Sequence, residues 1–161
     1  MSNVYLDRSP IAGTGVFAAR RLRAGELILS FAEGRPAVVP CTATHAAAQD
    51  GGLYLQIGED RYILPRPPAL YVNHSCDPNA GVRDCTDLIA LKPIAAGEEV
   101  AFDYSTSMAE DGWEMDCACR SALCRGRVRD FKHLPPERRA FYMERGVVGP
   151  FCFESLFTPA G

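Results

Sequence analysis

Short apolar segments separated by glycine turns dominate the hydrophobic pattern of this chain. Two stretches resemble each other, Arg21-Leu-Arg-Ala-Gly-Glu-Leu-Ile and Pro93-Ile-Ala-Ala-Gly-Glu-Glu-Val. In each, an Ala-Gly-Glu turn leads into an apolar run, which is typical of short strands rather than helices. We therefore expect strands over residues 15–18, 27–31, 38–39, 53–57, 62–64, 88–91 and 100–102.

Two segments predict helices instead. The segment from Thr42 to Gln49 is compatible with one short helix, with Thr42 or Thr44 as its N-cap. The segment from Pro136 to Arg145 is the clearer one, because proline and glutamate occupy its start and Gly146 follows its end. The chain is thus predicted to be mainly β, with a cysteine-bearing segment and a helical tail after the strands.

Composition and charge restrict the class of protein. A chain of 161 residues with 47% hydrophobic residues suits one compact domain with a sizeable core. Its net charge of −3 leaves no broad basic surface for nucleic acid or for a membrane. The first residues hold no apolar signal region, and no apolar run approaches the length of a membrane span. We expect an intracellular protein that binds neither nucleic acid directly nor a membrane.

The seven cysteines favour a metal site. An odd number of cysteines without a signal peptide favours metal ligands and free thiols over disulfides. Cys117, Cys119 and Cys124 form a tight Cys-x-Cys-x-x-x-x-Cys motif. Zinc bound by thiolates takes four ligands, so a fourth must come from elsewhere, and Cys76 is the best candidate. The alternative is three unconnected thiols in a loop. The remaining cysteines are expected to be small packed residues: Cys41, Cys85 and Cys152.

Four motifs follow one another along the chain: Gly13-Thr-Gly-Val-Phe-Ala, Asn73-His-Ser-Cys-Asp-Pro-Asn, Gly97-Glu-Glu-Val-Ala-Phe-Asp-Tyr and Cys117-Ala-Cys-Arg-Ser-Ala-Leu-Cys-Arg-Gly. In this order they resemble a SET-domain protein-lysine methyltransferase with a post-SET zinc-binding segment. The resemblance implies a SET-domain fold of short strands in several small sheets, with a pseudoknot-like active site. It also implies a SET domain over residues 1–115, a post-SET zinc segment over 116–126 and a helical tail over 127–161.

The resemblance assigns the reaction to three aromatic residues. Lysine methylation needs a neutral amine, yet free lysine has a pKa of about 10.4, so a narrow apolar channel that desolvates the amine suits this chemistry. Tyr104 is expected to be the active-site tyrosine whose hydroxyl orients that amine. Phe102 is expected to set the number of methyl groups, since a phenylalanine there leaves room for di- or trimethylation. Tyr54 is expected to form a wall of the lysine channel. From the residues alone, an ordinary strand tyrosine is the favoured interpretation of Tyr104, and Phe102 is compatible with a core position as well.

The resemblance also implies that the protein uses S-adenosyl-L-methionine. Asn73 is expected to contact the amino-acid part of the cofactor, and the backbone of His74 is expected to contact adenine. The other residues expected at the cofactor are Gly13, Thr14, Gly15, Tyr71 and Phe131. Without the resemblance, the Gly-Thr-Gly segment reads as an ordinary hairpin turn. Leu70 departs from the family, which often has an arginine at this position.

In the family the three clustered cysteines share one zinc ion with the cysteine of the Asn-His-Ser-Cys motif. The resemblance therefore implies a zinc site formed by Cys76, Cys117, Cys119 and Cys124. Zinc would order residues 116–126 and complete the lysine channel. The tail from residue 132 onward lies outside the resemblance, and we expect it to pack on the domain.

The leading hypothesis is a protein-lysine N-methyltransferase that acts on a lysine of a protein substrate, such as a histone-like or ribosomal protein. The alternative is a SET-fold binding module that has lost catalysis. Asn73, His74 and Tyr104 favour the enzyme. A purely structural zinc protein would explain the cysteines, but it would not explain the Phe-Asp-Tyr motif.

Overall fold

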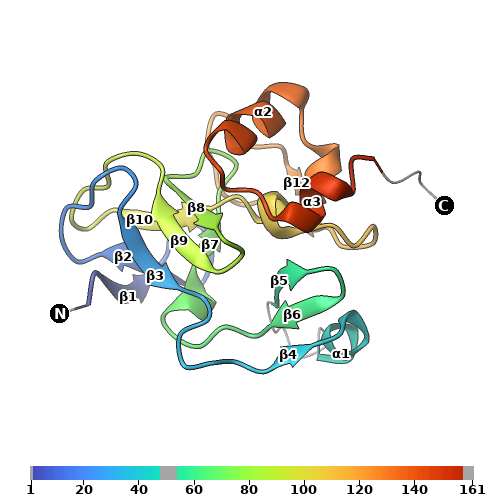
Figure 1. Ribbon diagram of the computed structural model, residues 1–161. Helices are drawn as coiled ribbons and strands as arrows, with labels where there is room; N and C mark the ends of the chain where they lie inside the picture. Colours follow the sequence, from blue (N-terminus) through green and yellow to red (C-terminus); the bar gives the residue numbers. More distant parts are fainter. Residues whose placement is uncertain (1, 48–53, 158–161) are drawn as a thin grey trace.

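A computed structural model describes residues 2–47 and 54–157 (Figure 1). Within these residues the strands form four small sheets, so the mainly β prediction is confirmed. The first sheet has the order β1-β2-β10-β7. Its strands are β1 (Val4–Arg8), β2 (Thr14–Ala18), β10 (Glu99–Phe102) and β7 (Asn73–His74). The second sheet has the order β3-β9-β8, with β3 (Leu27–Ser30), β9 (Asp87–Ala90) and β8 (Ala80–Arg83).

The remaining strands form two further sheets. The third sheet has the order β4-β6-β5, with β4 (Val38–Val39), β6 (Arg61–Ile63) and β5 (Leu55–Gly58). The fourth sheet pairs β11 (Met115–Asp116) with β12 (Arg127–Val128). The α-helices are α1 (Cys41–Ala47), α2 (Pro136–Glu144) and α3 (Pro150–Glu154). The 3₁₀ helices are η2 (Ala69–Tyr71), η3 (Tyr104–Ser107) and η4 (Phe131–His133).

The two similar segments of the sequence pair with each other. Leu22 and Ile94 form an isolated antiparallel bridge, in which each N–H donates to the carbonyl of the other residue. Both side chains are fully buried. The turns that follow contain Gly25 and Gly97, each at a φ of +81°, a left-handed conformation that glycine adopts without strain. The repeated Ala-Gly-Glu pattern therefore encodes two equivalent turns on either side of one buried contact.

The parallel pair of strands β7 and β10 brings two distant motifs together. Asn73 pairs with Ala101, and His74 pairs with Phe102. The N–H of Ser75 extends this ladder by donating to the carbonyl of Phe102 at 3.0 Å. Residues 73–76 consequently lie beside the end of β10, where residues 103–104 leave the sheet. This register positions the candidate site.

The C-terminal tail packs on the domain, as expected from its aromatic residues. It forms a second core cluster with strand β9, separate from the main core between the sheets. The buried members of this second cluster are Ile89, Phe131, Leu134, Tyr142, Val147, Phe151 and Cys152. In Figure 1 the tail runs in orange and red, and it places α2 and α3 on the same side of the molecule as β12.

Helix α2 agrees with the prediction to within one residue at its end, and α1 begins one residue earlier than predicted. The end of the first predicted helix and the start of the strand predicted at residue 53 lie outside the described residues. Of the strands that the hydrophobic pattern does not predict, β7, β11 and β12 have only two residues each, whereas β1 and β8 are longer. In β1 only Val4 is buried, and β8 begins with Ala80 and Gly81, so neither segment shows an apolar alternation.

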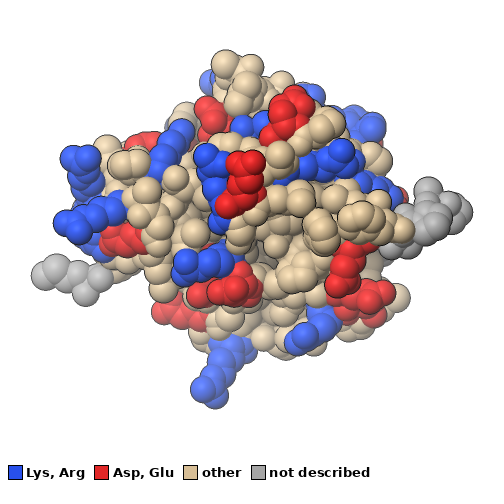
Figure 2. Space-filling model, turned by 45° about the horizontal axis from the view of Figure 1, so that its top comes forward, with Lys and Arg blue, Asp and Glu red and all other residues tan. Residues whose placement is uncertain are grey.

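No helix among the described residues is long and apolar enough to cross a membrane. On the face shown in Figure 2, acidic and basic side chains are interspersed rather than gathered into one basic patch. This distribution fits the small net charge of the chain.

Replacing Gly81 by alanine should destabilise the fold through the tail. An added Cβ would lie 2.8 Å from the Cβ of Val147, whose β-branched side chain is fully buried. We expect Gly81→Ala to lower the free energy of unfolding by about 1–3 kcal/mol, measured by urea unfolding. The matched control is Gly112→Ala, since a Cβ at Gly112 meets nothing within 4 Å. Equal stability of the two variants would contradict the tight packing of β8 on the tail.

Candidate active site and metal centre

Tyr104 lies where strand β10 passes into the 3₁₀ helix η3. Asp103 caps this helix by accepting a hydrogen bond from the N–H of Ser105. The backbone N–H of Tyr104 donates to Nδ1 of His74 at 3.1 Å, and its hydroxyl donates to the carbonyl of Val72 at 2.7 Å. Burial raises the pKa of Tyr104, so the side chain remains a neutral phenol. It can orient a ligand, but it is not a ready base.

A cavity of about 110 Å³ has Tyr104 in its wall. It contains all three of the aromatic residues expected in the lysine channel, Tyr54, Phe102 and Tyr104. The rings of Phe102 and Tyr104 pack with their centroids 4.9 Å apart. The complete lining is Phe31, Thr44, Tyr54, Leu55, Tyr62, Pro65, Ala69, Leu70, Val72, Phe102, Tyr104, Ser107, Met108, Glu110 and Trp113. Most of this wall is apolar or aromatic, which suits the desolvation of an amine.

The structure adds two residues that the sequence analysis missed. Trp113 lies in the channel with its ring centroid 6.4 Å from that of Tyr104, and Glu110 provides a carboxylate. Both lie shortly after the Phe-Asp-Tyr motif in irregular chain, where no periodicity marks them. The only available signal was that Trp113 is the single tryptophan of the chain. Leu70 also lines this channel, in the position where the family often has an arginine.

His74 connects the active-site tyrosine with the cysteine cluster. Its Nδ1 accepts from the N–H of Tyr104, so the ring hydrogen is on Nε2, which lies 3.3 Å from Sγ of Cys76. Burial lowers the pKa of His74 to about 4, and the imidazole is therefore neutral. Because both ring nitrogens are engaged, the imidazole of His74 has no ring nitrogen left for a metal or a cofactor.

The side chain of Asn73 connects strand β7 with the Gly-Thr-Gly turn and with Glu99 of strand β10. Its side-chain amide donates to the carbonyls of Ala12 and Thr14 at 3.1 and 3.2 Å, and to Oε1 of Glu99 at 2.9 Å. The Gly-Thr-Gly turn is thereby held against strand β7. The other carboxylate oxygen of Glu99, Oε2, is buried without a hydrogen-bond partner among the described residues. Such an orphaned acceptor beside an amide and a bend of exposed backbone fits a polar, cationic group such as the amino-acid part of S-adenosylmethionine.

The two glycines of this turn are needed for different reasons, Gly13 for its backbone conformation and Gly15 for its close packing. Gly13 adopts a φ of +50°, and an added Cβ would meet nothing within 4 Å. Gly15 is required by packing, since an added Cβ would collide with the carboxylate of Glu99. Tyr71, in η2 beside strand β2, is 36% exposed and thus has a face free for a ligand. The structure therefore holds the turn from Gly13 to Gly15 against Asn73, and it places η2, which contains Tyr71, in contact with strand β2.

Phe131 requires a correction. Its side chain is fully buried in the second core cluster, among residues that include Ile89 and Leu134. A ring that the protein encloses on all sides presents no face to adenine. The expectation that Phe131 covers the cofactor is therefore not met, and Phe131 is instead a core residue that anchors the tail.

The predicted cysteines converge from two distant segments. The Sγ atoms of Cys76, Cys117, Cys119 and Cys124 lie within 4.8 Å of one another. The sulfur atoms of Cys76 and Cys117 are 3.7 Å apart. Tetrahedral zinc with Zn–S bonds of about 2.3 Å places its sulfur atoms about 3.8 Å apart, so this donor set fits zinc. The N–H of Arg125 lies 3.4 Å from Sγ of Cys76, and it would support a thiolate there.

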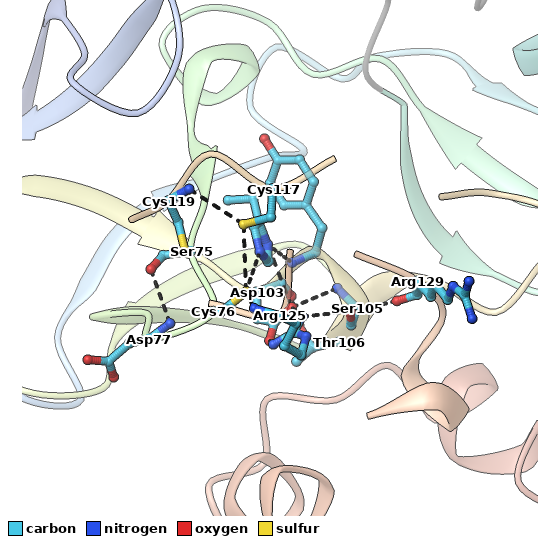
Figure 3. A network of polar contacts seen from close by, with 12 residues as sticks. Ser75, Cys76, Asp77, Asp103, Ser105, Thr106, Cys117, Cys119, Arg125 and Arg129 are labelled. Carbon is cyan, nitrogen blue, oxygen red and sulfur yellow. Dashed lines mark hydrogen bonds and ion pairs between the residues drawn. The ribbon is translucent and has the colours of Figure 1, made fainter. Parts of the chain in front are cut away.

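A network of polar contacts ties the cysteine cluster to the active site (Figure 3). The guanidinium of Arg125 makes two hydrogen bonds of 2.8 Å to the two carboxylate oxygens of Asp103. It also donates to the hydroxyl of Ser105, whose own hydrogen bond goes to the carbonyl of Arg129. The carboxylate of Asp103 is fully buried. Arg125 directly follows Cys124, so the cysteine segment and the residue before Tyr104 are held as one unit.

The C-terminal tail joins the same network. The hydroxyl of Tyr142 in α2 donates to Oδ2 of Asp103 at 2.8 Å. Arg138, one turn earlier, donates to the Tyr142 hydroxyl at 2.8 Å and to the carbonyl of Cys76 at 3.2 Å. Helix α2 therefore contacts both the candidate zinc ligand Cys76, which lies after strand β7, and the residue that precedes the candidate catalytic tyrosine.

Comparison with known proteins agrees with this geometry. The family model of the SET domain matches residues 13–105. Histone-lysine N-methyltransferase trr of Drosophila melanogaster is 32% identical over 137 residues, which cover 77% of this chain and 6% of the relative. Histone-lysine N-methyltransferase 2D of Homo sapiens is 31% identical over 137 residues, which cover 77% of this chain and 2% of the relative. This chain thus spans a small part of the length of these relatives. On the family match, and on the convergence of its motifs at Tyr104, the chain belongs to the SET domain family.

Proposed function

We propose that this protein is a protein-lysine N-methyltransferase that uses S-adenosyl-L-methionine. The observation that carries the proposal is the apolar channel that ends at the buried hydroxyl of Tyr104. Membership of the SET domain family supports it, as do relatives named as histone-lysine N-methyltransferases. A histone-like or other lysine-bearing protein is therefore the proposed substrate.

The channel residues would prepare the lysine amine. Aromatic and aliphatic walls, including Phe102 and Val72, exclude water and so favour the neutral amine over the ammonium. The hydroxyl hydrogen of Tyr104 is given to the carbonyl of Val72, which leaves the oxygen lone pairs free to accept from an amine N–H. Tyr104 would thus fix the direction of the nitrogen lone pair, which is an orientation effect.

S-adenosyl-L-methionine would supply an electrophilic methyl group on a sulfonium. Asn73, the backbone of His74, the turn from Gly13 to Gly15 and the exposed ring of Tyr71 are the groups proposed to bind it. The carboxylate of Glu99 accepts from the amide of Asn73 and has its other oxygen without a hydrogen-bond partner among the described residues, so it is a further acceptor proposed beside the cofactor.

We further propose that the four clustered cysteines bind one zinc ion. Zinc would fix residues 117–124 relative to Cys76, and Arg125 would then hold Asp103 beside Tyr104. Metal binding is in this way coupled to the shape of the channel as well as to folding.

The first test is methyl transfer by the wild type and by Tyr104→Phe. Zinc-loaded protein is incubated with radiolabelled S-adenosyl-L-methionine and either core histones or a cell lysate. We expect a labelled protein band that weakens about 100-fold in the variant, because the amine loses its orienting acceptor. Cofactor affinity, measured by calorimetry, should change by less than about twofold, since no cofactor group is removed. Cofactor binding without any label in the wild type would favour a non-catalytic binding module.

Phe102→Tyr tests the number of methyl groups. Phe102 is 3% exposed and packs on Tyr104 and Phe31, so a hydroxyl added to its ring would occupy part of the channel. We propose that the wild type forms di- or trimethyl-lysine, and that the variant shifts the product toward monomethyl-lysine. Mass spectrometry of the methylated substrate measures this ratio. An unchanged ratio would remove Phe102 as the determinant.

Removing the metal should abolish methyl transfer. We expect about one zinc per chain by elemental analysis, and loss of both zinc and activity in Cys119→Ser, because three thiolates hold zinc more weakly than four. Cys85→Ser is the matched control, since Cys85 is a half-buried thiol outside the cluster. It should keep both zinc and activity. Full activity of metal-free protein would refute the coupling.

A further inference from the structure

A single charged side chain lies among the apolar walls of the channel. Of the described residues that line it, Glu110 is the only aspartate, glutamate, lysine or arginine. Glu110 is half-buried and belongs to the irregular segment between η3 and β11. A carboxylate costs free energy in such surroundings unless it is hydrogen-bonded or finds a cation. A carboxylate in a channel whose other walls carry no charged side chain therefore indicates a site for a cationic ligand.

Glu110 is held in place through one of its two oxygens. The hydroxyl of Tyr62 donates to Oε2 at 2.8 Å, and Sγ of Cys41 lies 3.5 Å from the same oxygen. Both contacts use Oε2, so within the described part of the chain Oε1 is the oxygen left for a ligand. The carboxylate is thus fixed by neutral donors that leave its charge intact.

The protein does not neutralise this charge. None of the ion pairs formed within residues 2–47 and 54–157 involves Glu110. Its field is felt inside the channel, because burial raises the pKa of Tyr62 and the hydrogen bond and charge of Glu110 raise it further. Among the described residues, the carboxylate in the channel thus has no ion-pair partner.

Aromatic rings complete the surroundings of a cation. Tyr104 and Trp113 lie with their centroids 6.4 Å apart, and Phe102 and Tyr54 belong to the same lining. The faces of aromatic rings attract cations such as ammonium and methylammonium groups, most strongly where water is excluded. Combined with a carboxylate, such a wall is selective for alkylammonium ions over neutral groups of the same shape.

We propose that Glu110 makes the channel a binding site for alkylammonium cations and determines its selectivity for them. The carboxylate would attract the protonated lysine into the channel and retain a methylated product, because both carry a positive charge. Its attraction is for the ammonium form and not for the neutral amine that reacts, so its main effect would be on capture of the lysine. The natural ligand rests on the proposed function, whereas the cation site itself does not.

The site can be tested without any enzymatic activity. Trp113 is the only tryptophan of the chain and lines the channel, so its fluorescence reports directly on occupancy. The probes are choline, a quaternary ammonium ion, and 3,3-dimethyl-1-butanol, its neutral isostere. We expect choline to change the emission saturably, and the neutral alcohol to bind at least about tenfold more weakly, since it lacks the charge that Glu110 attracts.

Three variants assign the selectivity to Glu110. Glu110→Gln should weaken choline binding about tenfold and leave the alcohol unchanged. Glu110→Asp retains the charge and should retain the preference for choline, which separates charge from packing. Glu144→Gln is the control, because it removes one negative charge at an exposed position of α2. Equal binding of choline and the alcohol, or equal binding of choline by wild type and Glu110→Gln with native thermal unfolding, would overturn the proposal.

A kinetic measurement separates this inference from the proposed function. With a methylated substrate in hand, Glu110→Gln should raise the KM for the lysine substrate about tenfold and change kcat less than about twofold. An unchanged KM in an active enzyme would refute the role of Glu110 and leave the methyltransferase intact. The opposite outcome is also distinguishable. If the protein binds choline through Glu110 but methylates no substrate, the cation site is supported and only the proposed methyltransferase function is refuted.

Discussion

The buried carboxylate of Asp103 is the constraint on which the rest of the site depends. It is 1% exposed and receives two hydrogen bonds from Arg125, one from the hydroxyl of Tyr142 and one from the N–H of Ser105. A carboxylate removed from water costs several kcal/mol unless such partners surround it, and a buried pair that loses one partner is strongly destabilised. The segments that carry these partners must therefore meet at Asp103, although they are 22 and 39 residues away from it in sequence.

This constraint unites three parts of the chain that differ in character. Asp103 precedes Tyr104, Arg125 follows the last clustered cysteine, and Tyr142 lies in a tail outside the SET domain match. His74 adds a second connection, since it contacts both Sγ of Cys76 and the N–H of Tyr104. The geometry of Tyr104, the position of the clustered cysteines and the docking of the tail therefore depend on one another.

The channel meets two requirements that oppose each other. Apolar walls lower the pKa of a lysine amine by desolvation, whereas a carboxylate raises it by stabilising the ammonium. Both kinds of group line this channel, and they have different partners. The hydroxyl of Tyr104 donates to the carbonyl of Val72, and the carboxylate of Glu110 accepts from the hydroxyl of Tyr62. Charge would then govern the entry and retention of the side chain, while desolvation governs the step at Tyr104.

Sequence alone determined those elements that depend on neighbouring residues, and it indicated the family through the order of its motifs. The turn glycines, the helix from Pro136 and the strand after each Ala-Gly-Glu turn follow from backbone preferences of neighbouring residues. The order of the motifs indicated the family, and the spacing of the cysteines indicated a metal site that the convergence of their sulfur atoms supports.

Tertiary structure decided what depends on contacts between distant segments. The edge strand β1 shows no apolar alternation, because its stability comes from pairing with β2. Phe131 looked like a cofactor contact, but Ile89 and the tail enclose it. Glu110 and Trp113 carry no local signal, and only the packing of η3 and the segment after it against strands β5 and β6 places them in the channel. The burial of Phe131 and the surroundings of Glu110 and Trp113 depend on segments that are distant in sequence. For this reason no local pattern of residues specifies them.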